Sequence, residues 1–124
     1  MPIDEPRMTG SALLLPNRFG NLGAAVTVYL AAPEAGFIKE IHVIRDAAGG
    51  GGAFSTLTVT TPAGDISPTM PLALGGAAGD IDSQEFSRYD TNNVLGSGDG
   101  FSIACDGLDD GTPGAQILVV MEAF

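Results

Sequence analysis

Downstream of residue 23, apolar and polar residues alternate in short runs, which is the pattern of β-strands with one buried face. In the first run, Val26, Val28 and Leu30 share one face, while Thr27 and Tyr29 share the other. Further strand-forming runs are separated by turns rich in Gly, Pro and Asp. They span residues 37–45, 54–61, 101–105 and 115–124, while Pro68 and Pro71 limit residues 66–74 to an edge strand or an extended loop. The segment 83–90 instead predicts one helical turn, because Phe86 and Tyr89 lie three residues apart.

Two of these runs depart from simple alternation. In residues 37–45 the apolar side chains change face, and a β-bulge at Lys39-Glu40 would explain this. The alternative is a strand whose two faces are both partly covered. The run Ile117–Met121 is apolar on both faces, which predicts a central strand covered on both sides.

The first 23 residues differ from the rest of the chain. They contain three prolines and the isolated apolar run Leu13–Leu15, and Pro16 would end any helix or central strand. One hypothesis is a frayed terminus. We favour an extended arm that lies on a neighbouring subunit, because three adjacent leucines in a free tail would stay exposed to water. Its candidate contact residues are Met8, Leu13, Leu14, Leu15 and Phe19.

The spacing of the strands and turns, roughly 8–12 residues, is typical of an antiparallel sandwich or barrel. A chain of 124 residues fits one domain. We therefore expect an all-β protein with an N-terminal arm over residues 1–23 and an antiparallel β-sandwich over residues 24–124.

Charge restricts the partners of this chain. Asp and Glu total 15 against 5 Lys and Arg, so the formal charge is −10, which disfavours nucleic acid and anionic membranes. No apolar stretch approaches the length of about 18 residues that spans a membrane, and residues 1–5 do not resemble a signal peptide. We therefore expect synthesis in the cytoplasm. Most acids follow residue 64, which indicates either loops charged for solubility or a molecule with one acidic end and a near-neutral end that meets a partner.

The sequence shows no catalytic constellation. Cys105 and His42 are the only residues of their types, and we expect a buried cysteine and a structural histidine. The aspartates Asp106, Asp109 and Asp110 could bind Ca²⁺ or form a solvated turn, and Asp80 and Asp82 pose the same choice. The four glycines at 49–52 predict a flexible loop. We expect no enzyme activity, cofactor or metal.

Three segments resemble the capsid decoration proteins of tailed bacteriophages, also called cement or auxiliary head proteins. They are the strand and Pro-x-x-Gly turn at Val26–Gly36, the Gly-Asp-x-Asp-Ser segment within Gly76–Ser83, and the Gly-Asp-Gly turn within Asn93–Ile103. The resemblance covers roughly residues 24–124 and rests on turn residues rather than catalytic ones.

This resemblance implies a β-sandwich or jelly-roll-like fold without catalysis. It also implies binding to the major capsid protein on the exterior of a virion, after synthesis in a bacterial host, and a homo-oligomer, with a trimer favoured. Many repeated contacts would then add up by avidity. The alternatives are a tail, fibre or other phage structural component, or a β module that binds carbohydrate or Ca²⁺.

Overall fold

The computed structural model describes residues 12–90 and 92–124, and these residues form ten strands. The strands are β1 (Ala12–Phe19), β2 (Val26–Ala31), β3 (Gly36–Arg45), β4 (Thr56–Thr61), β5 (Gly64–Asp65), β6 (Met70–Pro71), β7 (Ile81–Glu85), β8 (Val94–Leu95), β9 (Gly100–Cys105) and β10 (Ala115–Ala123). The all-β prediction is confirmed. Nowhere in this part of the chain is there a helix of the length and apolarity needed to cross a membrane.

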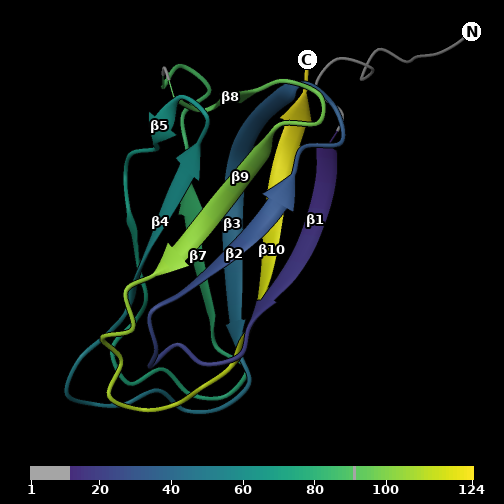
Figure 1. Ribbon diagram of the computed structural model, residues 1–124. Helices are drawn as coiled ribbons and strands as arrows, with labels where there is room; N and C mark the ends of the chain where they lie inside the picture. The colour runs from purple at the N-terminus through teal and green to yellow at the C-terminus, as the bar shows by residue number, and fades with distance from the viewer. Residues whose placement is uncertain (1–11, 91) are drawn as a thin grey trace, which may run out of the picture.

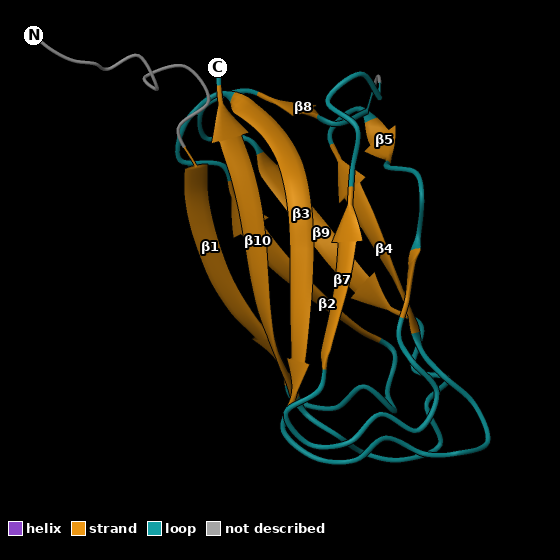
Figure 2. Cartoon of the chain, turned by 180° about the vertical axis from the view of Figure 1, so that it is seen from behind, coloured by secondary structure: helices purple, strands orange, loops and turns teal. Residues whose placement is uncertain are grey.

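The strands form two antiparallel sheets that lie face to face (Figures 1 and 2). Sheet A has the order β1-β10-β3-β7, with β8 beside β3. Sheet B has the order β2-β9-β4-β5, with β6 beside β4. The first four strands alternate between the two sheets. β9 then pairs between β2 and β4 in sheet B, and β10 pairs between β1 and β3 in sheet A. This winding of eight main strands in two sheets is a jelly roll.

The core fills the space between the two sheets. It is built from alternate residues of each long strand, including Ile41 and Val43 of β3, Ile103 of β9 and Val119 of β10, all fully buried. Burial of one face per strand is the main source of stability, at about 1.5–3 kcal/mol for each large apolar side chain. β10 is central, as its sequence predicts, because it pairs with β1 on one side and β3 on the other.

The predicted bulge in β3 is present. Val120 lies opposite Glu40 but Met121 lies opposite Ile38, so Lys39 is the extra residue. The bulge explains the change of face: Ile38 and Ile41 both point into the core although they are three positions apart, an odd spacing that places residues of a regular strand on opposite faces.

A buried asparagine completes the sheet beside this bulge. β7 pairs with β3 from Glu40 onward, and β8 pairs with Gly36 and Phe37, which leaves Ile38 and Lys39 between them. The side chain of Asn93 takes the place of a strand there. Its Oδ1 accepts the Ile38 N–H at 3.0 Å, and its Nδ2 donates to the carbonyls of Ile38 and Ser87, both at 2.8 Å.

The expected boundary at residue 23 does not coincide with a break in the fold. Residues 12–19 form β1, which pairs with β10 over its full length. Pro16 is accommodated because β1 is an edge strand, where a missing N–H leaves no interior gap in the ladder. An arm can therefore comprise only residues before Ala12, and these lie outside the described residues.

The helical turn expected over residues 83–90 is also wrong. Ile81–Glu85 form β7, which pairs with β3, and residues 86–90 form a turn. The spacing of Phe86 and Tyr89 was misleading, since Phe86 is buried in the core while Tyr89 is 85% exposed. Pairing with β3 outweighs the weak local preference of this segment.

Replacing Asn93 by Ala should destabilise the protein strongly, because the buried Ile38 N–H and C=O would lose their partners. Each unpaired buried group costs about 1–3 kcal/mol, so we expect the free energy of unfolding to fall by about 3 kcal/mol or more. Urea unfolding measures this change. Gln116→Ala is the matched control: its amide is exposed, and we expect about 0.5 kcal/mol or less. Equal losses in both variants would contradict the role of Asn93.

Candidate interaction surfaces

No other described strand covers the outer face of sheet A (Figure 2), although Arg88 and Phe124 pack on it at Phe37. The pairing places its outward residues in rows. One row runs Leu14, Val120, Glu40 and Glu85, the next runs Pro16, Leu118, His42 and Ser83, and the last runs Arg18, Gln116, Ile44 and Ile81. We call the apolar part of these rows the sheet A face; it consists of Leu14, Pro16, Ile44, Ile81, Leu118 and Val120.

The sheet A face is both exposed and hollowed. Leu14 is 60% exposed and Ile81 is 61% exposed, while Ile44, Leu118 and Val120 are half-buried. A cavity of about 470 Å³ opens near Pro16, Ile44 and Leu118. An exposed apolar surface with a hollow is typical of a site that another molecule covers.

The five predicted contact residues have different places in the fold. Leu14 lies on the sheet A face, whereas Leu13 and Leu15 point inward and pack against the core. Phe19 is fully buried within its own chain, so it is not free to contact a partner in this structure. Met8 lies outside the described residues.

Sequence analysis missed the other members of the sheet A face. The signal was present in Ile117–Met121, whose two apolar faces predict cover on both sides. The structure supplies cover on one side only: Ile117, Val119 and Met121 are buried between the sheets, while Leu118 and Val120 point outward. Ile44 and Ile81 join them only through the pairing of β3 with β7.

A polar row crosses the middle of sheet A. His42 Nδ1 lies 2.7 Å from Ser83 Oγ, and His42 Nε2 lies 3.2 Å from Glu40 Oε2. Serine, histidine and a carboxylate in line are the components of a catalytic triad. We interpret the row as hydrogen bonding on the outer face of sheet A, since the cavities beside Tyr29, Pro16 and Phe37 are lined by neither His42 nor Ser83.

The long loops at the bottom of Figure 1 are held together by carboxylates. Asp109 Oδ1 accepts the N–H groups of Gly50 and Gly111, both at 2.8 Å, and Asp110 accepts the Gly52 N–H. Asp106 Oδ1 accepts the Thr56 N–H at 3.0 Å. Backbone N–H groups of the predicted flexible glycine loop therefore hydrogen-bond to carboxylates in the loop between β9 and β10.

A buried arginine lies behind these loops. The Arg45 side chain is fully buried, lies 3.3 Å from Asp82 and 3.8 Å from Asp109, and donates to the Ala73 carbonyl. Its charge explains why two of the acids point inward, since a buried guanidinium needs nearby carboxylates. No cluster of three or more metal-ligating side chains forms within residues 12–90 and 92–124.

The acidic second half of the sequence does not form one end of the molecule. Because successive strands run in opposite directions, its loops fall at both ends. Asp80, Asp106 and Asp109 lie at the loop end described above, whereas Asp90 and Asp99 lie at the opposite end. The hypothesis of one acidic end is therefore wrong.

An ion pair and the cysteine have displaced pKa values. The Arg18 guanidinium, which hydrogen-bonds Asp46 at the exposed rim of the loop end, lowers the pKa of that carboxyl. Burial raises the pKa of the Cys105 thiol, whose Sγ lies 3.5 Å from the Leu22 carbonyl. Cys105 is 3% exposed, so the prediction of a buried cysteine is confirmed.

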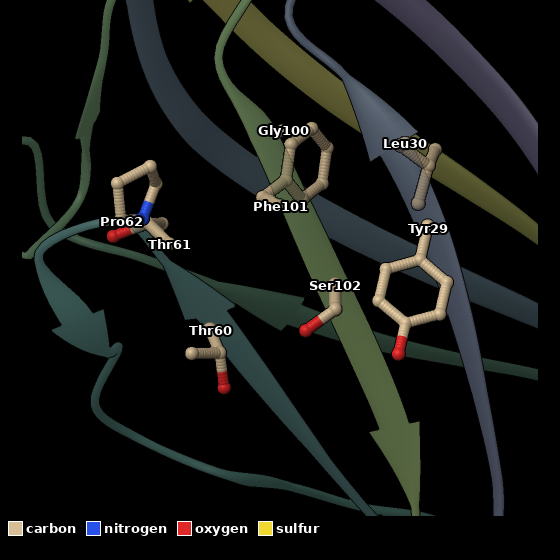
Figure 3. A pocket seen from close by; sticks show the side chains of 8 residues that line it. All are labelled: Tyr29, Leu30, Thr60, Thr61, Pro62, Gly100, Phe101 and Ser102. Atoms are coloured by element: carbon tan, nitrogen blue, oxygen red, sulfur yellow. The ribbon is translucent and has the colours of Figure 1, made fainter.

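Sheet B has a different outer face. Its outward residues are small or hydroxyl-bearing, and Tyr29 of β2, 77% exposed, is the one large side chain among those that the pairing of β2, β9 and β4 places there. Beside it a hollow of about 260 Å³ opens between β9 and β4 (Figure 3). We call the hollow and its lining residues the tyrosine groove; they are Tyr29, Leu30, Thr60, Thr61, Pro62, Gly100, Phe101 and Ser102.

Comparison of the sequence with models of known protein families gives no match, and comparison with curated proteins gives none either. Among solved structures, the chain is similar to one described as the structure of infectious bursal disease virus, Gx strain. The TM-score is 0.32 and the sequence identity is 13%, over 91% of this chain and 30% of that one. A similarity at this level supports no inference about function.

Replacing Gly50 by Ala should destabilise the loop end, because a Cβ there collides with the Asp110 carboxylate. We expect a loss of about 1–3 kcal/mol in urea unfolding. Gly51 is the matched control, since a Cβ at that position meets nothing within 4 Å. Gly51→Ala should be neutral or slightly stabilising, because it restricts the unfolded chain. If the two variants unfold alike, the carboxylates do not hold the loop.

The Cys105 thiol should react slowly in the folded protein. Burial hides the sulfur and its raised pKa keeps it protonated near neutral pH. Labelling with Ellman's reagent should therefore be slow in buffer and fast in concentrated urea. Rapid stoichiometric labelling of the folded chain would contradict its burial.

Proposed function

We propose that this chain is a non-catalytic structural protein that coats the outer surface of a viral shell, as a capsid decoration protein does. The observation that carries the proposal is the sheet A face. It is a solvent-facing apolar surface on a sheet, and no other described strand covers it. Covering it would remove Leu14, Ile81 and their half-buried neighbours from water, and each large side chain contributes about 1.5–3 kcal/mol when fully buried.

Three further features support this proposal. Jelly rolls are used by viral capsid proteins, although also by lectins and cupins, so the fold alone does not decide function. The charge of −10 favours an exterior location, where the protein does not compete for packaged nucleic acid. The resemblance of residues 24–124 to phage decoration proteins points to the major capsid protein as the partner.

Charge placed on the sheet A face should weaken shell binding. Leu14→Glu introduces a carboxylate at a side chain that is 60% exposed, so the fold should tolerate it. We expect affinity for shells of the virus that encodes the chain to fall by at least about tenfold, since a buried unpaired charge is strongly unfavourable. Co-sedimentation with shells stripped of the protein measures this.

Leu108→Glu is the matched control for that experiment. Leu108 is 61% exposed, lies in the loop between β9 and β10, and receives the same added charge. It should bind like the parent chain. Equal loss in both variants would show a general charge effect and remove the sheet A face as the contact. Electron microscopy of whole particles separates the locations: density on the capsid exterior supports decoration, and density only in the tail excludes it.

The oligomeric state is part of the same proposal. A decoration protein of this kind would act as a homo-oligomer, with a trimer favoured by the family resemblance. Light scattering of the purified protein tests this. A monomer at all concentrations would exclude a preformed trimer.

A further inference from the structure

The tyrosine groove combines an aromatic ring with a row of hydroxyls. The pairing of β2, β9 and β4 places Tyr29, Ser102 and Thr60 directly beside one another. Figure 3 shows these three side chains on neighbouring strands, with the ring of Tyr29 next to Ser102. The Thr60 hydroxyl donates to Asp65 at 2.7 Å, which leaves its oxygen free to accept a hydrogen bond.

The hollow exists because two strands separate. The ladder between β4 and β9 ends at Thr60 and Ser102, whereas the ladder between β2 and β9 continues to Ala31 and Gly100. Gly100 leaves the floor open, since a Cβ there would meet only the Leu30 carbonyl oxygen, at 3.8 Å. A second hollow of about 220 Å³ lies on the other side of Tyr29, toward β1.

The chemistry of both hollows indicates an uncharged ligand. Their lining residues include aromatic, aliphatic, hydroxyl and amide side chains, and none of them carries a charge. Each hollow is smaller than a drug-sized pocket of about 300–1,000 Å³, so the site suits one small ring.

We propose that the tyrosine groove binds a neutral sugar unit of a glycan. One side of a pyranose ring is rich in C–H groups and packs flat on an aromatic ring, while its hydroxyls exchange hydrogen bonds with serine and threonine. Tyr29 supplies the ring, and Ser102 and Thr60 supply the hydroxyls. Aromatic residues make up only 6% of the chain and Trp is absent, but one exposed ring beside the hollow is sufficient.

This inference goes beyond the proposed shell contact and does not depend on it. The two sheets lie back to back, so a molecule attached through the sheet A face turns sheet B away from the surface to which it binds. Attachment and glycan binding can therefore occur together.

Nuclear magnetic resonance titration of the ¹⁵N-labelled full chain tests the proposal directly. The probes are the methyl glycosides of glucose, galactose, mannose and N-acetylglucosamine, with N-acetylneuraminic acid as the charged comparison. We expect at least one neutral sugar to shift the amide signals of residues 29–31, 60–61 and 100–102, with weak affinity because the contacts are few. No shift in the groove with any neutral sugar, or stronger shifts elsewhere, overturns the proposal.

Variants then locate the binding energy. Tyr29→Ala should weaken binding by at least about tenfold through loss of the stacking surface. Tyr89→Ala is the matched control, because Tyr89 is 85% exposed but lies outside the groove. Gly100→Val should block the hollow and keep a folded spectrum, since a Cβ has room there. Binding that survives both Tyr29→Ala and Gly100→Val overturns the proposal, and it leaves the shell contact of sheet A unaffected.

Discussion

β10 is apolar on both of its faces, and a sandwich of two sheets buries only one of them. Ile117, Val119 and Met121 fill the core, which leaves Leu118 and Val120 pointing outward from the centre of sheet A. β10 is the central strand between β1 and β3. Leu118 and Val120 could turn toward the core only if Ile117, Val119 and Met121 turned outward. The apolar outer surface is therefore a direct consequence of the strand on which the core is built.

The rest of the molecule keeps this sheet rigid. The bulge at Lys39 lets β3 turn its apolar residues inward on both sides of the irregularity, and Asn93 fills the interruption in pairing that follows from it. At the loop end, Asp109 and Asp110 accept backbone N–H groups of the glycine loop, so long connections are held without helices or disulfides. A rigid sheet loses little conformational entropy on binding, which would favour the proposed contact with a shell.

The two outer faces differ in chemistry in a way that suits separate tasks. The sheet A face presents leucine, isoleucine and valine, which gain from burial against another protein. Sheet B presents Thr, Ser and Gly around a single exposed tyrosine, which gains little from a protein contact but can hold a small polar ring. Their back-to-back arrangement allows one face to attach and the other to remain accessible.

Most of the fold could be predicted from alternation. The all-β class, the central place of β10, the bulge at Lys39 and the burial of Cys105 all follow from local sequence pattern and are confirmed. The helical turn at 83–90 was wrong, residues 12–19 of the predicted arm belong to sheet A, and the predicted glycine loop is held by hydrogen bonds that the sequence did not indicate. In each case a distant partner decided the outcome: β10 for Ala12–Phe19, β3 for Ile81–Glu85, and the carboxylates of Asp109 and Asp110 for the glycines.

The candidate sites, too, depend partly on local sequence and partly on distant partners. The sequence by itself determined that Ile117–Met121 carries apolar side chains on two faces, because alternation along one strand is a local property. Only the tertiary structure decided which side lies in the core, and which residues of β1, β3 and β7 complete the outer surface. The tyrosine groove could not be predicted from the sequence. It forms where β4 separates from β9, and that separation corresponds to no local sequence pattern.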